Sequence, residues 1–117
     1  MNNITELSDE EILAIADPWW DDLVKYSNNK NYGGFIRNFS KKFREAANEM
    51  EVGKQFARSQ LTHNLRKERD FLGIIRRGEY VTVLYRQTNE KLPGEWLGRL
   101  VLGYEDGEVK IFGATLF

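Results

Sequence analysis

Aspartates and tyrosines are the residues of this chain whose types and spacing could carry out acid–base chemistry. Three aspartates flank a Trp-Trp pair near the N-terminus, and three tyrosines could donate hydrogen bonds: Asp17, Asp21, Asp22, Tyr26, Tyr32 and Tyr85. A carboxylate base in an apolar pocket, with a phenol that stabilises an enolate, would suit a cofactor-free isomerase. However, Asp21 and Asp22 fall between the apolar positions of an amphipathic helix, so we expect them to face water. The pattern therefore favours no catalytic residue.

His63 is the only histidine, and the chain has no cysteine. A histidine base needs a group that orients it, and only Glu68 and Asp70 lie nearby in the sequence. Its position beside Asn64 and Arg66 is typical of a surface residue. Without cysteine there can be no disulfide, thiolate catalysis or zinc–thiolate site, and a transition-metal site on one histidine would be unusual. We predict no metal and no cofactor.

Charge is distributed unevenly along the chain. The first 22 residues contain acidic side chains but no Lys or Arg, whereas residues 25–77 contain thirteen basic and five acidic ones. The densest basic run lies within residues 58–77: Arg58, Arg66, Lys67, Arg69, Arg76 and Arg77. Such a run could bind phosphates or another anion. Its interruption by Glu68 and Asp70, together with a pI of about 5.9, argues against a dedicated nucleic-acid protein.

The length and composition fit one domain over residues 1–117. Apolar residues make up 41% of the chain, which is enough for a core. The start shows no basic segment followed by an apolar run, and no stretch approaches the roughly 18 apolar residues of a membrane span. We therefore expect a cytoplasmic protein that does not enter a membrane.

Helices are expected in the first half, over about residues 9–65. Ser8 and Glu11 form a capping box, and apolar residues then recur at helical spacing, which predicts one helix over about 9–28 with a kink at Pro18. A second helical piece is expected over 32–43, with a possible break near Ser40. A third is expected over 49–65.

Strands are expected in the second half, over about residues 71–117. A short apolar run covers 71–75, and the following segments 79–87, 96–105 and 108–117 alternate as strands do. Asp106-Gly107 has the composition of a two-residue hairpin turn. The order of elements predicts an α+β fold, with N-terminal helices packed on an antiparallel sheet of about four strands.

The hairpin turn predicts a register in which Glu105 faces Glu108, Leu102 faces Ile111 and Val101 faces Phe112. One face of the hairpin should then carry Trp96, Leu100, Leu102, Tyr104, Val109, Ile111 and Phe117. The other should carry Leu97, Arg99, Val101, Phe112, Ala114 and Leu116. Because both faces are largely apolar and helices can cover only one, we predict that the second set forms a homodimer interface.

Three segments resemble small bacterial members of the nuclear transport factor 2-like, cystatin-like α+β superfamily. They are the acidic first helix ending near Lys25-Tyr-Ser, the segment from Asn31 to Ser40, and the terminal hairpin from Gly94 to Gly113. The resemblance implies a curled, cone-shaped sheet, a pocket between helices and sheet, and frequent dimers packed sheet to sheet. Some members are isomerases or dehydratases.

Together these patterns favour a non-enzymatic, dimeric domain that binds a small apolar or aromatic ligand or a protein partner. The aromatic residues expected to line its pocket are Trp19, Trp20, Tyr32, Phe35, Trp96 and Tyr104. The first alternative is a cofactor-free isomerase or dehydratase. The second is an anion- or nucleic-acid-binding protein that uses residues 58–77.

Overall fold

The N-terminal helix forms as its capping sequence predicts. The computed structural model describes residues 3–46 and 63–117, and begins with a short 3-10 helix, η1 (Ile4–Glu6), followed by α1 (Asp9–Asn28). The Ser8 hydroxyl accepts from the Glu11 amide at 3.1 Å, and the Ser8 amide donates to the Glu11 carboxylate at 3.0 Å. These bonds satisfy amides that the first turn leaves free. The predicted bounds of α1 are confirmed, and the helix continues through Pro18.

The second helical piece is divided in two, as the possible break near Ser40 suggested. Its parts are α2 (Tyr32–Phe35) and α3 (Lys41–Ala46). Between them the chain runs beside the last strand, where the Ser40 amide donates to the Ile111 carbonyl and the Ile111 amide donates to the Asn38 carbonyl, both at 2.8 Å. Most of the predicted third helix lies outside the described residues. Its predicted last residue, Leu65, instead begins a strand.

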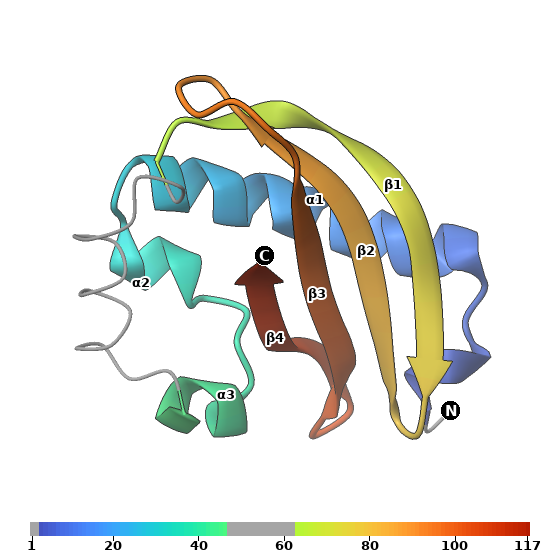
Figure 1. Ribbon diagram of the computed structural model, residues 1–117. Coiled ribbons are helices and arrows are strands. Elements are labelled where there is room, and N and C mark those ends of the chain that lie inside the picture. The colour runs from blue at the N-terminus through green and yellow to red at the C-terminus, as the bar shows by residue number, and fades with distance from the viewer. Residues whose placement is uncertain (1–2, 47–62) are drawn as a thin grey trace.

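The sheet is an antiparallel meander in the order β1-β2-β3-β4, and α1 lies across one of its faces (Figure 1). Its strands are β1 (Leu65–Arg77), β2 (Tyr80–Asn89), β3 (Trp96–Glu105) and β4 (Glu108–Leu116). The sheet is not strongly curled, so the expected curl is wrong. We call the face toward α1 the inner face and the opposite one the outer face. The fold is α+β, as predicted.

The predicted register of the β3–β4 hairpin holds near its turn and fails beyond a bulge. Glu105 pairs with Glu108 and Leu102 with Ile111, and both turn residues have positive φ. Between Val101 and Leu102 the register shifts, so that Val101 pairs with Gly113 and not with Phe112. The extra residue on β4 exchanges the two faces for every residue that follows.

This exchange corrects three predicted positions. Ala114 pairs with Leu100 and Leu116 with Gly98, and both side chains pack against the core, so these two residues do not belong to the outer face. Phe117 was expected on the core face. It lies beyond the bulge, opposite Leu97, and is 63% exposed.

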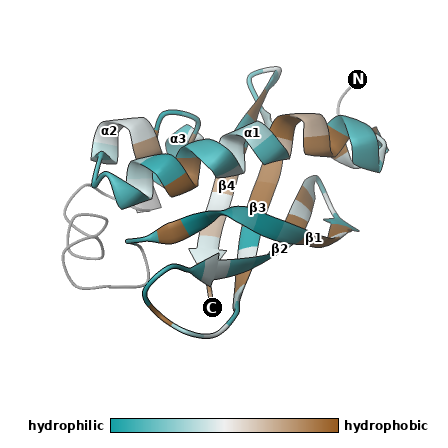
Figure 2. Cartoon of the chain, turned by 90° about the horizontal axis from the view of Figure 1, so that it is seen from above, coloured by the Kyte–Doolittle hydropathy of each residue, from teal (hydrophilic) through white to brown (hydrophobic). Residues whose placement is uncertain are grey.

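The core lies between α1 and the inner face (Figure 2). From α1 it includes Ile12, Ala16, Trp20, Leu23 and Val24, and from the sheet Val81, Val83, Tyr85, Leu100, Leu102 and Ile111. The Trp20 ring rests on β3 at Gly98, where an added Cβ would stand 2.6 Å from the indole. In the part of the chain that is described, no helix has the length and apolarity needed to cross a bilayer.

Candidate functional site

The structure brings one candidate carboxylate and one candidate phenol together on the inner face. The Tyr85 hydroxyl of β2 donates to the Asp17 carboxylate of α1 at 2.7 Å. Arg69 of β1 lies beside both groups: its guanidinium donates to the Asp17 carbonyl oxygen at 2.9 Å and pairs with the carboxylate of Asp21. The expectation that Asp21 faces only water is therefore incomplete, because it faces an arginine from the sheet.

The electrostatics of this cluster favour a neutral phenol. Burial raises the pKa of Tyr85 well above its ordinary value, the hydrogen bond to Asp17 and the charge of that carboxylate raise it further, and Arg69 acts in the opposite direction. Because the hydroxyl is engaged by Asp17, and Arg69 holds both aspartates, the cluster links α1 to β1 and β2. Its arrangement is that of a structural connection.

The remaining acid–base candidates lie apart from this cluster. Asp22 pairs with Arg37 at 3.2 Å, and the Tyr26 ring lies against Gly34. His63 is half-buried, and its Nε2 atom has no hydrogen-bond partner. Asp70, one of the two nearby carboxylates, pairs with Arg86 instead. Among residues 3–46 and 63–117, no cluster of three or more histidine and acidic side chains could hold a metal ion.

Gln87 is a buried polar residue that the strand pattern did not single out. Its Oε1 accepts from the Trp20 indole at 2.9 Å, and its Nε2 donates to the Arg66 carbonyl at 2.6 Å. Trp20 is 4% exposed, and its ring centroid lies 5.1 Å from that of Tyr85. Trp20 therefore fills the core. The sequence indicates a buried Gln87 only through its position, because Gln87 continues the series of inward-facing residues in β2.

The other predicted pocket residues are distributed over the molecule. Phe35 packs edge-on against Phe39 at 5.5 Å, while Trp19 and Tyr32 are half-buried on separate helices. Trp96 and Tyr104 stand at opposite ends of β3, so that about 26 Å of extended strand separates them. A ligand that touched both would have to lie along the whole strand. Ligand binding by this set stays a prediction.

The basic segment 58–77 is only partly available for an anion. Arg76 donates to the Leu7 carbonyl at 2.9 Å and pairs with Asp9 at 2.7 Å, while Arg69 is held by α1. Arg66, Lys67 and Arg77 are exposed, and Arg58 lies outside the described residues. Two of the six charges are thus used to attach α1 and the N-terminal segment to β1.

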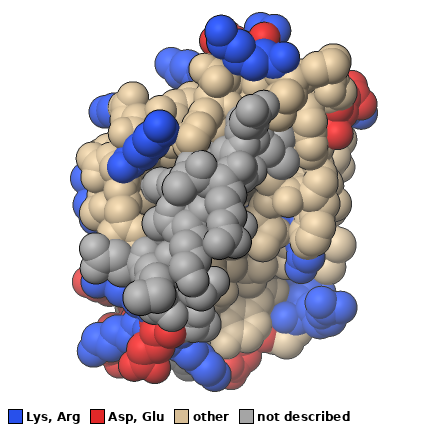
Figure 3. Space-filling view, turned by 60° about the vertical axis from the view of Figure 1, so that its left-hand side comes forward, with Lys and Arg blue, Asp and Glu red and all other residues tan. Residues whose placement is uncertain are grey.

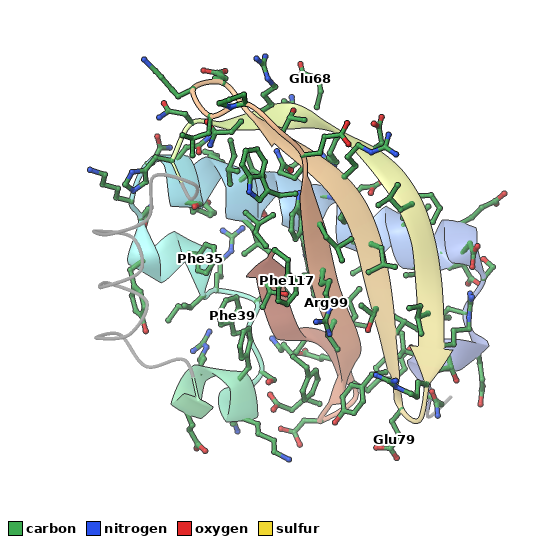
Figure 4. All side chains as sticks on the ribbon, in the orientation of Figure 1. Phe35, Phe39, Glu68, Glu79, Arg99 and Phe117 are labelled. Atoms are coloured by element: carbon green, nitrogen blue, oxygen red, sulfur yellow. The ribbon has the colours of Figure 1, made fainter. Side chains whose placement is uncertain are left out.

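The outer face is the side of the sheet that α1 does not cover, and it carries exposed apolar residues. Its apolar residues come from all four strands: Ile75, Tyr80, Leu84, Leu97, Val101, Phe112 and Phe117. Arg99 lies among them, with its guanidinium carbon 5.3 Å from the Phe117 ring centroid (Figure 4). Figure 3, which brings the α2 and α3 side forward, shows Lys, Arg, Asp and Glu side chains mainly around the edge of the view.

A cavity of about 310 Å³ opens at one end of the outer face, near the β3–β4 turn. It is lined by Lys42 and Phe43 of α3 and by Tyr80, Val101 and Phe112 of the sheet. We call it the α3 groove. Val101 and Phe112 were predicted as dimer-interface residues, and none of the six predicted pocket residues lines this groove.

Comparison of the chain with family models, with curated proteins and with solved structures finds no match. The structure shows an α+β fold in which one long helix packs on a four-stranded antiparallel meander. The likeness to the nuclear transport factor 2-like superfamily stays a prediction from the sequence.

Proposed function

We propose that this chain is a non-enzymatic binding domain whose outer face binds a protein partner, in the first place a second copy of itself. The observation that supports this most is the outer face itself. Among the described elements α3 reaches one end of it, and Ile75 is 50% exposed and Phe117 63% exposed on it. An exposed apolar surface on a small domain is typical of an interaction site.

The composition of the outer face also resembles that of protein interfaces. Tyrosine, phenylalanine and arginine are enriched at the centres of such interfaces, where lysine, glutamate and aspartate are depleted. Here Tyr80, Phe112 and Phe117 accompany Arg99, for which no ion pair with a described residue is present. The same face also carries Arg77, Arg86 and Lys110, which pair with Tyr80, Leu97 and Gly103. The aromatic ring beneath Arg99 accommodates its charge and shields part of it from water.

A second copy is the simplest partner with a matching surface. Two sheets packed face to face stand about 10 Å apart and bury both apolar faces, and two-fold dimers are the commonest assemblies. The resemblance to the nuclear transport factor 2-like superfamily, in which dimers pack sheet to sheet, supports the same arrangement. The corrected interface set contains Leu97, Arg99, Val101, Phe112 and Phe117.

The cofactor-free isomerase is the alternative, and the 2.7 Å contact between Tyr85 and Asp17 is the observation in its favour. We rank it second because Arg69 holds Asp17 and Asp21. An isomerase would keep its carboxylate free to remove a substrate proton.

Light scattering at several concentrations tests the dimer, with one matched pair of variants. We expect the native chain at about 27 kDa, twice its mass of 13.7 kDa. Phe117→Asp places a charge on the outer face at the chain end, and should give the monomer mass. Phe71→Asp is the control: Phe71 is also exposed, but it pairs with Tyr85 and so lies on the opposite side of the sheet. It should leave the dimer intact. A native monomer at every concentration would refute the proposal.

A further inference from the structure

We infer that the α3 groove is a binding site for a small aromatic monocarboxylate. The inference rests on the proposed function in that both place binding on the outer face. It adds a ligand class and a location near the β3–β4 turn, about 13 Å along β3 from Leu97. The argument uses the groove's walls, its charge and its size.

Aromatic side chains form the walls of the groove and are held in place by their neighbours. The Tyr80 and Phe112 rings pack edge to face with centroids 5.1 Å apart, and Phe43 stacks on Phe39 at 4.4 Å. Gly103 leaves the space for the first pair, because an added Cβ would lie 2.8 Å from Tyr80 and 3.2 Å from Phe112. Fixed rings of this kind favour a flat, apolar ligand that stacks on them or meets them edge-on.

The charge of one lysine determines what else the ligand should carry. Lys42 lines the groove, and no carboxylate does. The neighbouring Lys41 has an acidic partner, Asp106 at 3.9 Å, whereas no ion pair holds Lys42 to any described residue. One lysine suits one carboxylate. A phosphate is usually bound by several donors arranged around it.

The size of the groove points to a ligand of one or two rings. A volume of about 310 Å³ lies at the lower end of the range for small-molecule sites. A ligand of this size in a partly open site should bind with a Kd between about 10 µM and 1 mM. An exposed ion pair with Lys42 should contribute a factor of up to about five in affinity.

Titration with two matched probes, followed by backbone amide NMR shifts, tests the site. 2-Naphthoate carries the carboxylate, and 2-naphthalenemethanol has the same rings without the charge. We expect both to shift amides around Val101, Phe112 and Phe43, with naphthoate binding up to about five times more tightly. Lys42→Gln should abolish this difference between the probes. Lys41→Gln, an exposed neighbour outside the groove, should leave it unchanged.

Three outcomes would overturn the inference: no saturable naphthoate binding by either the native or the Phe117→Asp chain, shifts centred elsewhere, or a preference for naphthoate that survives Lys42→Gln. The same titration on Phe117→Asp separates this inference from the dimer. If the native chain is monomeric at every concentration and still binds naphthoate, the dimer is refuted and the inference about the groove stands. Because Val101 and Phe112 belong to both the groove and the proposed interface, the monomeric Phe117→Asp chain is the decisive sample: a native dimer whose Phe117→Asp monomer does not bind naphthoate would refute the groove alone.

Discussion

Replacing Gln87 by methionine should destabilise the protein strongly, although the side chain keeps nearly the same length. The Trp20 indole and the Arg66 carbonyl would each lose a partner, at 2.9 Å and 2.6 Å respectively. A polar group left buried without a partner costs about 1–3 kcal/mol. Part of this cost is offset because the methionine itself has no amide to desolvate, so we expect a loss of about 2–3 kcal/mol. For 117 residues this corresponds to a fall in Tm of about 10 °C.

Urea denaturation followed by far-ultraviolet circular dichroism measures this loss. Because Trp20→Phe removes the indole donor, a double-mutant cycle isolates the interaction between the two side chains. In the Trp20→Phe background the Gln87→Met change should cost about 1 kcal/mol less, since no indole is left unpaired. Strictly additive effects, or a loss below about 0.5 kcal/mol for Gln87→Met alone, would show that this hydrogen bond does not stabilise the core.

Three further predictions concern a close contact and two titrating groups. Gly98→Ala should cost about 1–3 kcal/mol in urea denaturation, because its Cβ would stand 2.6 Å from Trp20; an unchanged midpoint would contradict this. Tyr85→Phe should cost about 1 kcal/mol near neutral pH. Since burial raises the pKa of Tyr85, its contribution is complete below the unfolded value of about 10 and falls above it. The unfolding free energy of the native chain should therefore exceed that of Tyr85→Phe by less and less between about pH 10 and 11. A difference that stays constant over this range would refute the reasoning. The bonds from the Ser8 backbone and side chain lower the pKa of Glu11, so its contribution is present above the unfolded pKa and is lost as pH falls through the folded one. An NMR titration should find the Glu11 pKa below its ordinary value, and Ser8→Ala should raise it; equal values in both chains would refute the role of the cap.

The β3–β4 hairpin shows how far local sequence can predict this sheet. Asp106-Gly107 prescribes a two-residue turn, and a turn of known length fixes the pairs next to it, which are confirmed from Glu105 to Leu102. The bulge beyond Leu102 has no comparable signal, since both strands are apolar there. One unpaired residue was enough to place Ala114, Leu116 and Phe117 on the wrong faces.

β1 shows why a search for apolar periodicity fails where charges face inward. Arg69 and Arg76 point toward α1 and the N-terminal segment, where Asp21, Asp9 and the Leu7 carbonyl receive them. The groups that pair with Arg69 and Arg76 are many residues away in sequence. The sequence of β1 alone therefore looks like a polar segment, although both arginines lie on its inner face. The groove residue Lys42 was missed for a similar reason, because only the folded chain brings α3 to Tyr80.

The strand-like segment over residues 38–40 has a consequence for how copies of this chain can join through their backbones. It binds both the backbone amide and the carbonyl of Ile111 in the middle of β4. A strand from a second copy could therefore not form a continuous row of hydrogen bonds along the free edge of β4. Within the described residues this leaves β1 as the long edge open to pairing. Two β1 edges that pair with each other use up both open sides. Edge-to-edge growth would then end at two copies, because residues 38–40 interrupt the edge of β4.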